Sequence, residues 1–493
     1  MLSRRAISRR AFSASLAAAA ASRVRARTPR PKLAVLIVLE QFRPDYLDAV
    51  RSQLSPAGFL QLMEKGAYFP DCRHNASTFS SAALATLATG AWPAQHGIVA
   101  DSWYDRAARR AVRASDEALR ATTLAAQISS DPNAHTAVIS LDRSHASLFA
   151  GSPRTRVFWM DDAGSFATAG QPPEWLSTFN NYKAAEAARN AKWQALGAKP
   201  DAPALRTLTW SPDHPAAFLA LYRASPFGQS AQFNLLSELI AREGMGKGNT
   251  FDFVCLISQS TALLGYETGS QSPLMSQMVL QLDREIDQLL GQLTRTLGEN
   301  GFVLCVAAAH GAPPEPEADS RGRMAVPGEL VAKSVQASLT PAGASVERYV
   351  YPFLYLDPGT RDYEATRVAA ARAALGLPAV ASWFTAGGAC STFSDWEHRF
   401  RNSFHAVRSG DVMLSYRPEY VEDFGQGRGV SYGSIYNYDV QTPLLFYCPQ
   451  FFRHGLFEYP VESVDLAPTL ARAFGVAAPS SSVGRVLTEA LTE

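Results

Sequence analysis

The chain has 493 residues, of which 47% are hydrophobic and 18% charged, and this globular composition excludes a disordered, collagenous or coiled-coil protein. No run of 18 apolar residues occurs, so no transmembrane helix is expected. Residues 1–30 hold eight Arg and no acidic residue, and the rest of the chain has a net charge of −7, which argues against a nucleic-acid partner.

The N-terminal 30 residues have the composition of a targeting segment. The sequence SRRAFS at residues 8–13 resembles the twin-arginine export motif, and a short, weakly apolar stretch follows at residues 14–21. This order predicts an export signal and therefore a periplasmic or secreted protein. The competing interpretation is a mitochondrial presequence, which is also rich in Arg and Ser and poor in acidic residues.

Short apolar runs alternate with helical patterns along residues 31–493, which we expect to form one domain. The run at 33–39 is continuously apolar, as in a strand buried on both faces. Similar runs lie at 136–141, 251–258, 301–309, 350–356 and 442–448, and helical patterns lie at 58–65, 233–242, 276–297, 363–375 and 463–474. The alternation predicts an α/β fold with a mostly parallel central sheet sandwiched by helices. Ligands of such sheets bind beyond the carboxyl ends of the strands.

Two stretches interrupt this alternation. Residues of about 144–225 contain Trp159, Pro172-Pro173 and Trp175 but little clear strand pattern. A second stretch, at about 311–410, begins with a segment rich in Pro and Glu. We expect both to be cap insertions over the sheet.

Polar motifs follow these elements in a specific order. They read VLEQFRPDYL (38–47), STFSS (77–81), ATGAWPAQHG (88–97), DSWYD (101–105), LDR (141–143), SPFG (225–228), STALLGY (260–266), AAHG (308–311), RSGD (408–411), YGSIYNY (432–438) and VDLAPT (464–469). Together they resemble the alkaline phosphatase superfamily, and most of all its Thr-nucleophile alkaline phosphatases and its nucleotide pyrophosphatase/phosphodiesterases. The resemblance runs from about residue 31 to residue 475.

The resemblance implies two Zn²⁺ ions held by Asp and His side chains around a Ser or Thr nucleophile. One metal activates the nucleophile and the other stabilises the leaving oxygen. Transferred position by position, the nucleophile falls on Ser80 at a helix N-terminus, where backbone amides favour a phosphate. The retained ligands are Glu40 and His310. The other ligand positions hold side chains that do not bind zinc, namely Ala262, Tyr266, Ala309 and Tyr432.

The positions implied to bind the substrate phosphate differ as well. The Asn of the family falls on Asp101, whose carboxylate repels a phosphate, and a Lys falls on Leu141. Arg143 is retained. Compared with the family, this site is therefore expected to hold fewer metal ions and to attract a phosphate less strongly.

Three hypotheses follow from these changes. In the first, the protein is a catalytically inactive, exported pseudo-phosphatase with no metal. In the second, it is a weak or altered phosphoester hydrolase that uses a single divalent metal such as zinc, with Ser80 as nucleophile and Glu40 and His310 as ligands. In the third, it is a metal-free protein that binds a phosphorylated or other small molecule, or a partner protein. Two zinc ions are not expected in any of them.

Structural roles for the same residues stay open beside these hypotheses. Ser80 alone is typical of a helix cap, and His310 is compatible with a hydrogen-bonded core residue. Glu40 is placed to pair with Arg43 or Arg143. The two tyrosines are of a size to fill vacated His positions, with their hydroxyls bridging the space that the metals left.

Overall fold

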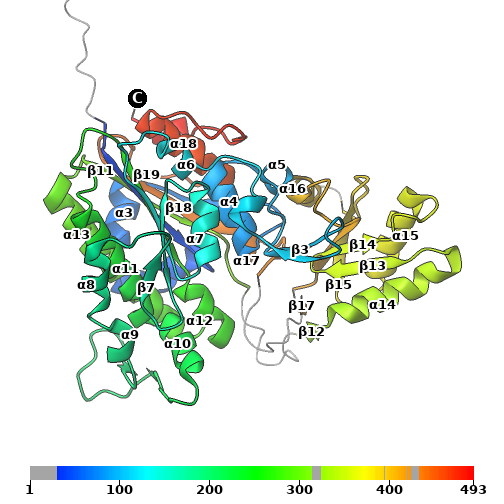
Figure 1. Ribbon diagram of the computed structural model, residues 1–493, viewed down its shortest axis with the longest axis horizontal. Helices are drawn as coiled ribbons and strands as arrows, with labels where there is room; N and C mark the ends of the chain where they lie inside the picture. Colours follow the sequence, from blue (N-terminus) through cyan, green and yellow to red (C-terminus); the bar gives the residue numbers. More distant parts are fainter. Residues whose placement is uncertain (1–29, 314–323, 393–394, 419, 423–431, 493) are drawn as a thin grey trace, which may run out of the picture.

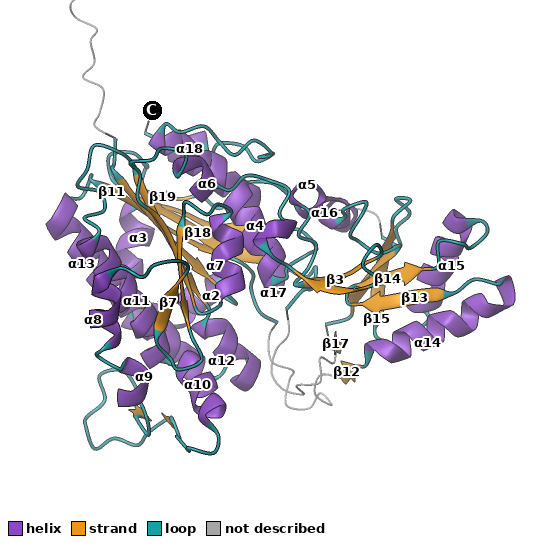
Figure 2. Cartoon of the chain, viewed as in Figure 1, coloured by secondary structure: helices purple, strands orange, loops and turns teal. Residues whose placement is uncertain are grey.

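The computed structural model describes residues 30–313, 324–392, 395–418, 420–422 and 432–492. The predicted export signal therefore lies outside the described residues, apart from Arg30. Figures 1 and 2 show a larger lobe built on a twisted sheet and a smaller lobe, coloured yellow in Figure 1, built on a second sheet.

A ten-stranded sheet forms the core of the large lobe among the described residues, in the order β19-β2-β18-β11-β1-β10-β5-β6-β7 with β20 beside β2. Its strands are β1 (Leu33–Leu39), β2 (Ala67–Arg73), β5 (Thr136–Ser140), β6 (Arg156–Met160), β7 (Phe166–Thr168), β10 (Asp252–Ser258), β11 (Phe302–Ala308), β18 (Gln441–Tyr447), β19 (Gly455–Leu456) and β20 (Val461–Glu462). The strands from β11 through β1, β10 and β5 to β6 run parallel, whereas β18 is antiparallel to β11 and β2. The predicted mostly parallel sheet is confirmed.

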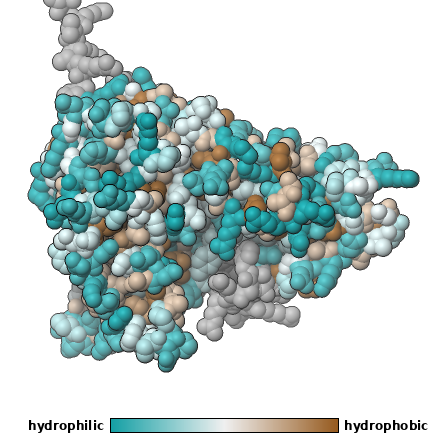
Figure 3. Space-filling model, in the orientation of Figure 1, coloured by the Kyte–Doolittle hydropathy of each residue, from teal (hydrophilic) through white to brown (hydrophobic). Residues whose placement is uncertain are grey.

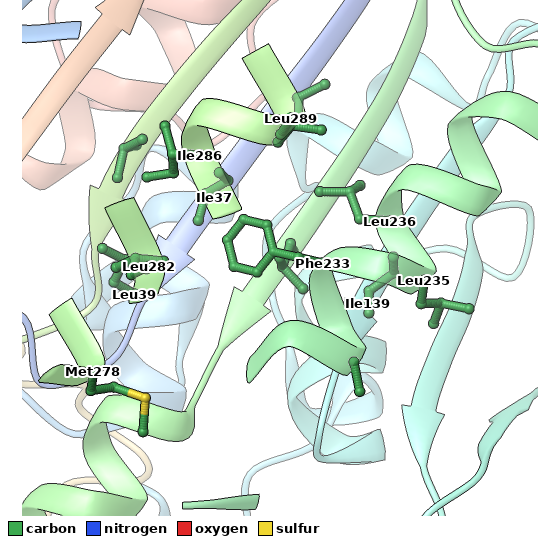
Figure 4. Packing of buried hydrophobic residues seen from close by; sticks show 14 of the residues in the cluster. Ile37, Leu39, Ile139, Phe233, Leu235, Leu236, Met278, Leu282, Ile286 and Leu289 are labelled. Atoms are coloured by element: carbon green, nitrogen blue, oxygen red, sulfur yellow. The ribbon is translucent and has the colours of Figure 1, made fainter. Parts of the chain in front are cut away.

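Helices cover both faces of this sheet. Along β1, Val35 and Ile37 point into one hydrophobic cluster and Leu36 and Val38 into the other, as the two-residue period of a strand requires. The first cluster is closed by α3 (Phe59–Lys65), α11 (Pro226–Arg242) and α13 (Pro273–Leu297), and the second by α4 (Ser80–Thr89), α6 (Leu124–Ile128), α7 (Arg143–Ala150) and α18 (Leu466–Phe474). Figure 4 shows the first cluster, in which Ile37 lies near Ile286 of α13 and Phe233 of α11.

The small lobe is an antiparallel sheet in the order β13-β14-β16-β15, with α14 (Gly328–Leu339) and α15 (Tyr363–Leu375) packed on it. Its strands are β13 (Val346–Val350), β14 (Phe353–Leu356), β15 (Val380–Thr385) and β16 (Val412–Tyr416). The apolar run at 350–356 therefore belongs to this second sheet. Asp411, which is 3% exposed, accepts hydrogen bonds from Arg106, Arg367 and the backbone of Leu356. Asp411 of the RSGD motif thus links β14, α15 and the segment around Arg106 by hydrogen bonds.

The remaining elements connect or extend the two sheets. Within residues 144–225, β6 and β7 form one edge of the central sheet. The other helices and strands are α2 (Pro44–Ala49), α5 (Pro93–His96), α8 (Glu174–Asn180), α9 (Ala184–Ala187), α10 (Pro215–Arg223), α12 (Ser260–Thr268), α16 (Asp395–Ser403), α17 (Asn437–Val440), β3 (Ser102–Asp105), β4 (Arg110–Arg113), β8 (Lys192–Trp193), β9 (Arg206–Thr207), β12 (Met324–Val326) and β17 (Tyr420–Glu422).

On the face shown in Figure 3, hydrophilic residues predominate and hydrophobic residues occur in small separate groups. None of the helices in the described ranges combines the length and the hydropathy needed to cross a membrane.

Candidate functional site

The residues singled out by the sequence meet where the central strands end. Glu40 directly follows β1, His310 lies two residues after β11, and Ser80 is the first residue of α4. Backbone hydrogen bonds hold the two strand ends: Glu40 N donates to Ser258 O at 3.1 Å, and Phe42 N donates to His310 O at 2.9 Å. Glu40 is 3% exposed, and Ser80 and His310 are fully buried. The structure thus brings the three retained positions together in the interior.

The Ser80 hydroxyl lies between the other two side chains. Its Oγ is 3.0 Å from Oε2 of Glu40 and 3.1 Å from Nε2 of His310. Nδ1 of His310 is 2.9 Å from the carbonyl oxygen of Gly311, which can only accept, so Nδ1 carries the ring proton and Nε2 is an acceptor. Burial lowers the pKa of His310 and outweighs the nearby carboxylate of Glu40, so the ring is neutral at pH 7. The Ser80 hydroxyl has one proton and therefore donates to only one of the two acceptors, Oε2 of Glu40 or Nε2 of His310, at a time.

His145, in the first turn of α7, is a member of the site that the sequence did not single out. Its Nδ1 lies 3.2 Å from Oε1 of Glu40, and its side chain is 17% exposed. The cation beside Glu40 is thus His145, and the alternative of pairing with Arg43 or Arg143 is wrong. Arg43 pairs with Asp45 at 2.5 Å instead.

Two contacts compete for the Nδ1 atom of His145. Nε2 of Gln259 is 2.9 Å away, and Oε1 of the same amide accepts from Ser140 Oγ and from the backbone of Leu141, which fixes the amide orientation. A neutral His145 would accept from this amide, whereas an imidazolium would pair with Glu40. Burial lowers the pKa of His145, but the charge and hydrogen bond of Glu40, with smaller contributions from Asp142 and Asp101, raise it to about 9. The raised pKa therefore favours the imidazolium at neutral pH, whereas the hydrogen bond from Gln259 requires the neutral ring.

This charge state predicts how stability depends on pH. A histidine whose pKa is about 9 in the folded protein and about 6.5 in the unfolded chain stabilises the fold fully below pH 6.5. The contribution disappears as the pH rises through 9, and it amounts to at most about 3 kcal/mol. Compared with His145→Gln, the wild-type protein should lose this much more unfolding free energy between pH 6 and pH 10, as measured by urea denaturation.

The exposed His135 provides the matched control for this measurement. The variant His135→Gln should follow the wild-type profile, because the His135 side chain is exposed to solvent, where a charge contributes little to stability. Equal pH profiles for His145→Gln and wild type would show that His145 is neutral and bound to Gln259.

Asp101 occupies the anion position at the start of α4. Its Oδ1 accepts a hydrogen bond from the backbone N–H of Ser81 at 2.8 Å, and its Oδ2 accepts from the hydroxyl of Tyr432 at 3.2 Å. The first N–H groups of a helix have no partner within the helix and attract anions. The carboxylate of Asp101 therefore occupies one of the backbone donors at the start of α4.

The two tyrosines pack across the site. The ring of Tyr432 lies over that of His310, with 4.2 Å between ring centroids, and the ring of Tyr266 on α12 meets Tyr432 edge-on at 5.4 Å. Burial raises the pKa of both phenols, so each hydroxyl keeps its proton and acts as a donor. The methyl groups of Ala262 and Ala309 are buried and offer no metal ligand.

The residues present do not fit a pair of zinc ions. A catalytic zinc takes three protein ligands plus water, and two such ions need about six. Across the described ranges, no group of three or more His, Cys, Asp and Glu side chains is arranged to hold a metal ion.

Arg143, the retained cation of the predicted phosphate site, contacts an aromatic ring. Arg143 is exposed, and its guanidinium stacks on the ring of Trp159, 4.8 Å from the ring centroid. Leu141, at the implied Lys position, is 6% exposed and uncharged. Glu40 and Asp101 both contact the start of α4, through the Ser80 hydroxyl and the Ser81 backbone N–H, whereas Arg143 stacks on Trp159.

The sequence and the fold have counterparts among known proteins. The model of the type I phosphodiesterase / nucleotide pyrophosphatase family matches residues 34–421. Because this match spans most of the chain, the protein belongs to that family. Membership of the alkaline phosphatase superfamily, expected from the motifs, is thereby confirmed.

Individual relatives match almost the whole chain. The alkaline phosphatase PafA of Elizabethkingia meningoseptica is 24% identical over 539 residues, covering 94% of this chain and 95% of PafA. The alkaline phosphatase PhoK of a Sphingomonas species is 28% identical over 527 residues, covering 94% and 91% of the two chains. The crystal structure of PafA superimposes with a TM-score of 0.83 at 22% identity, covering 94% of this chain and 99% of the other. The predicted alkaline-phosphatase-like fold is confirmed.

Proposed function

We propose that this family member is an exported pseudo-phosphatase, in which a self-contained polar network has replaced the two-zinc chemistry. The observation that carries the proposal is the carboxylate of Asp101 at the N-terminus of α4. It accepts from Ser81 N and from the Tyr432 hydroxyl, both beside the Ser80 position. The protein thus supplies its own anion where a substrate phosphate would have to bind.

The balance of charge supports the same conclusion. The network contains the carboxylates of Glu40 and Asp101 and one cation, the imidazolium of His145. A phosphate ester would bring further negative charge into a buried site that already carries an excess of it. Like charges repel strongly where water is excluded. Neither Leu141 nor the stacked Arg143 compensates for this excess.

A second candidate is a weak hydrolase with one metal. Oε2 of Glu40 and Nε2 of His310 both lie within 3.1 Å of Ser80 Oγ, so three atoms of ligand type converge on one point. This convergence favours a single divalent ion over two. Against it, the hydroxyl of Ser80 would have to serve as ligand and nucleophile at once.

The proposed location rests on the sequence of residues 1–30. Its twin-arginine-like motif supports export to the periplasm or the outside of the cell, on a route that carries folded proteins. There the protein would act by binding a small molecule or a partner and not by hydrolysis.

An activity assay separates the two candidates. We expect purified protein to hydrolyse aryl phosphate monoesters and diesters no faster than a buffer blank, with and without added zinc, because the anion position is occupied. Zinc-dependent turnover that Ser80→Ala and His310→Ala each abolish would establish the one-metal hydrolase and contradict the pseudo-phosphatase. Ser81→Ala is the matched control, since it keeps the backbone donor to Asp101. Turnover that survives Ser80→Ala and His310→Ala comes from another site or from a contaminant.

A further inference from the structure

A cluster of basic side chains lies at the junction of the two lobes, where α5 packs against α16 (Figure 1). It consists of Arg120, His405 and Arg408, which come from two segments far apart in the sequence. Arg120 is exposed, and His405 and Arg408 are half-buried. All three residues are therefore accessible to a ligand from solution.

Gly97, which follows α5, brings the two arginines together. Its φ of 78° favours glycine, and a Cβ here would lie 2.7 Å from Nη1 of Arg408 and 3.2 Å from Cγ of Arg120. The backbone N–H of Arg120 donates to His96 O at 2.9 Å, and Nη1 of Arg408 donates to Gly97 O at 2.5 Å. The two arginines are therefore held beside each other despite their like charge.

The protein supplies little negative charge to this cluster. Among the described residues, no carboxylate forms an ion pair with Arg120 or Arg408. Burial and the nearby charge of Arg120 lower the pKa of Arg408, and the opposing effect of Asp105 is the smallest of the three. Oδ1 of Asp105 already accepts two backbone hydrogen bonds, from Ala107 N and Ala108 N. The positive charges of the arginines are thus left largely uncompensated.

His405 adds a hydrogen-bond donor to the cluster. Its Nδ1 accepts from Val407 N at 3.3 Å, so the proton of the neutral ring lies on Nε2. This N–H group makes no hydrogen bond to any residue in the described ranges. Burial and the charges of Arg408 and Arg120 lower the pKa of His405. A bound anion would accept from Nε2 and relieve the repulsion among the three side chains.

We propose that Arg120, His405 and Arg408 bind a tetrahedral oxyanion, namely the phosphate or sulfate group of a small molecule. A guanidinium group donates two parallel hydrogen bonds to the oxygens of such a group. Two guanidinium groups and one ring N–H suit a dianion. A carboxylate, with one charge, would leave one arginine without a counter-charge.

This oxyanion site is separate from the network around Ser80. His96, the residue before Gly97, contacts Thr86 of α4 through Nε2 at 3.1 Å. Thr86 comes six residues after Ser80, which corresponds to about 9 Å along a helix. The inference therefore holds whether or not the Ser80 site has catalytic activity.

Isothermal titration of the purified protein with inorganic phosphate, at an ionic strength held constant with chloride, tests the inference. One phosphate should bind per chain, and sulfate should compete with it. Arg120→Gln and Arg408→Gln should each weaken binding by at least about tenfold, because charge-assisted hydrogen bonds are lost. Arg372→Gln removes the same charge from an exposed position on α15 and should bind phosphate as wild type does. Tighter binding of glycerol 3-phosphate than of inorganic phosphate would identify the ligand as an ester, and weaker binding would identify it as the free ion.

The pKa of His405, measured by NMR of its ring C–H groups, separates binding from a structural role of the arginines. Saturating phosphate should raise this pKa in the wild type, and Arg120→Gln should raise it without phosphate, since a like charge is removed. Because Arg120 is exposed, this variant should unfold at the same temperature as wild type or higher. The inference is overturned if neither phosphate nor sulfate binds, if Arg120→Gln binds phosphate as wild type does, or if bound phosphate leaves the pKa of His405 unchanged.

Discussion

A variant that combines Glu40→Asp, Ala262→Asp, Tyr266→His, Ala309→Asp and Tyr432→His should bind two zinc ions per chain. These changes restore, together with His310, the set of six ligands that the family resemblance implies. The positions lie where the fold requires them, at the ends of β1 and β11, on α12 and before α17. Carboxylates and Zn²⁺ compensate one another's charge, so the five changes should succeed only together. Elemental analysis of the folded variant gives the stoichiometry.

Single changes should behave very differently. Ala309 is fully buried, so Ala309→Asp alone places a carboxylate in the interior without a metal and should destabilise the protein. A matched control introduces Asn at positions 40, 262 and 309 with the same two His changes, since amides of equal size lack the charge that zinc requires. A five-site variant that is folded by circular dichroism but binds no zinc would contradict the transfer of these positions. Hydrolysis should additionally require Asp101→Asn and Leu141→Lys, to restore the donors that orient a phosphate.

Removing the central carboxylate should cause the largest loss of stability. Glu40→Ala removes the carboxylate that raises the pKa of His145, so His145 should lose its proton at pH 7 and accept from Gln259, and Ser80 loses one acceptor. Loss of this pair should cost up to about 3 kcal/mol of unfolding free energy. Adding His145→Gln in the Glu40→Ala background should then change the unfolding free energy by less than about 1 kcal/mol, because no uncompensated cation remains. Urea denaturation of the four proteins of this cycle at pH 7 measures both effects.

Two controls show whether the loss arises from the ion pair. Glu238→Ala, which breaks a more exposed pair with Arg242, should cost no more than about 1 kcal/mol. A metal chelator should leave the stability of wild type and Glu40→Ala unchanged. If chelation destabilises the wild type to the level of Glu40→Ala, then Glu40 acts as a metal ligand and not as the partner of His145.

The sequence predicted the buried elements of the fold well and their pairing less well. Residues 33–39 and 363–375 coincide with β1 and α15, because a continuous apolar run and a helical pattern each mark burial directly. The run at 350–356 looks the same but lies in the second sheet, and β18 runs antiparallel. An apolar pattern shows that a strand is buried and does not identify its neighbour or its direction.

The sequence likewise identified some residues of the site and missed others. Glu40, Ser80 and His310 were grouped by the resemblance to the family, whose motifs relate positions that are far apart in the sequence, and the ends of parallel strands are where such a site is expected. His145 was missed because spacing identifies only ligands that are close along the chain, whereas its partner Glu40 is far away in sequence. A usable signal was its place two residues after Arg143, in the first turn of the helix that follows β5. The role of Asp101 likewise depends on Tyr432, a contact that no local pattern encodes.

The central claim is that hydrogen bonds and the ion pair of Glu40 with His145 hold the site together without a pair of zinc ions. The most direct test is the zinc content of the wild-type protein after incubation with excess zinc at pH 7 and removal of free metal, measured by native mass spectrometry and elemental analysis. The five-site variant, treated in parallel, shows that the procedure detects a dinuclear site. We expect well below one zinc per wild-type chain, whereas two zinc ions per wild-type chain would contradict the account.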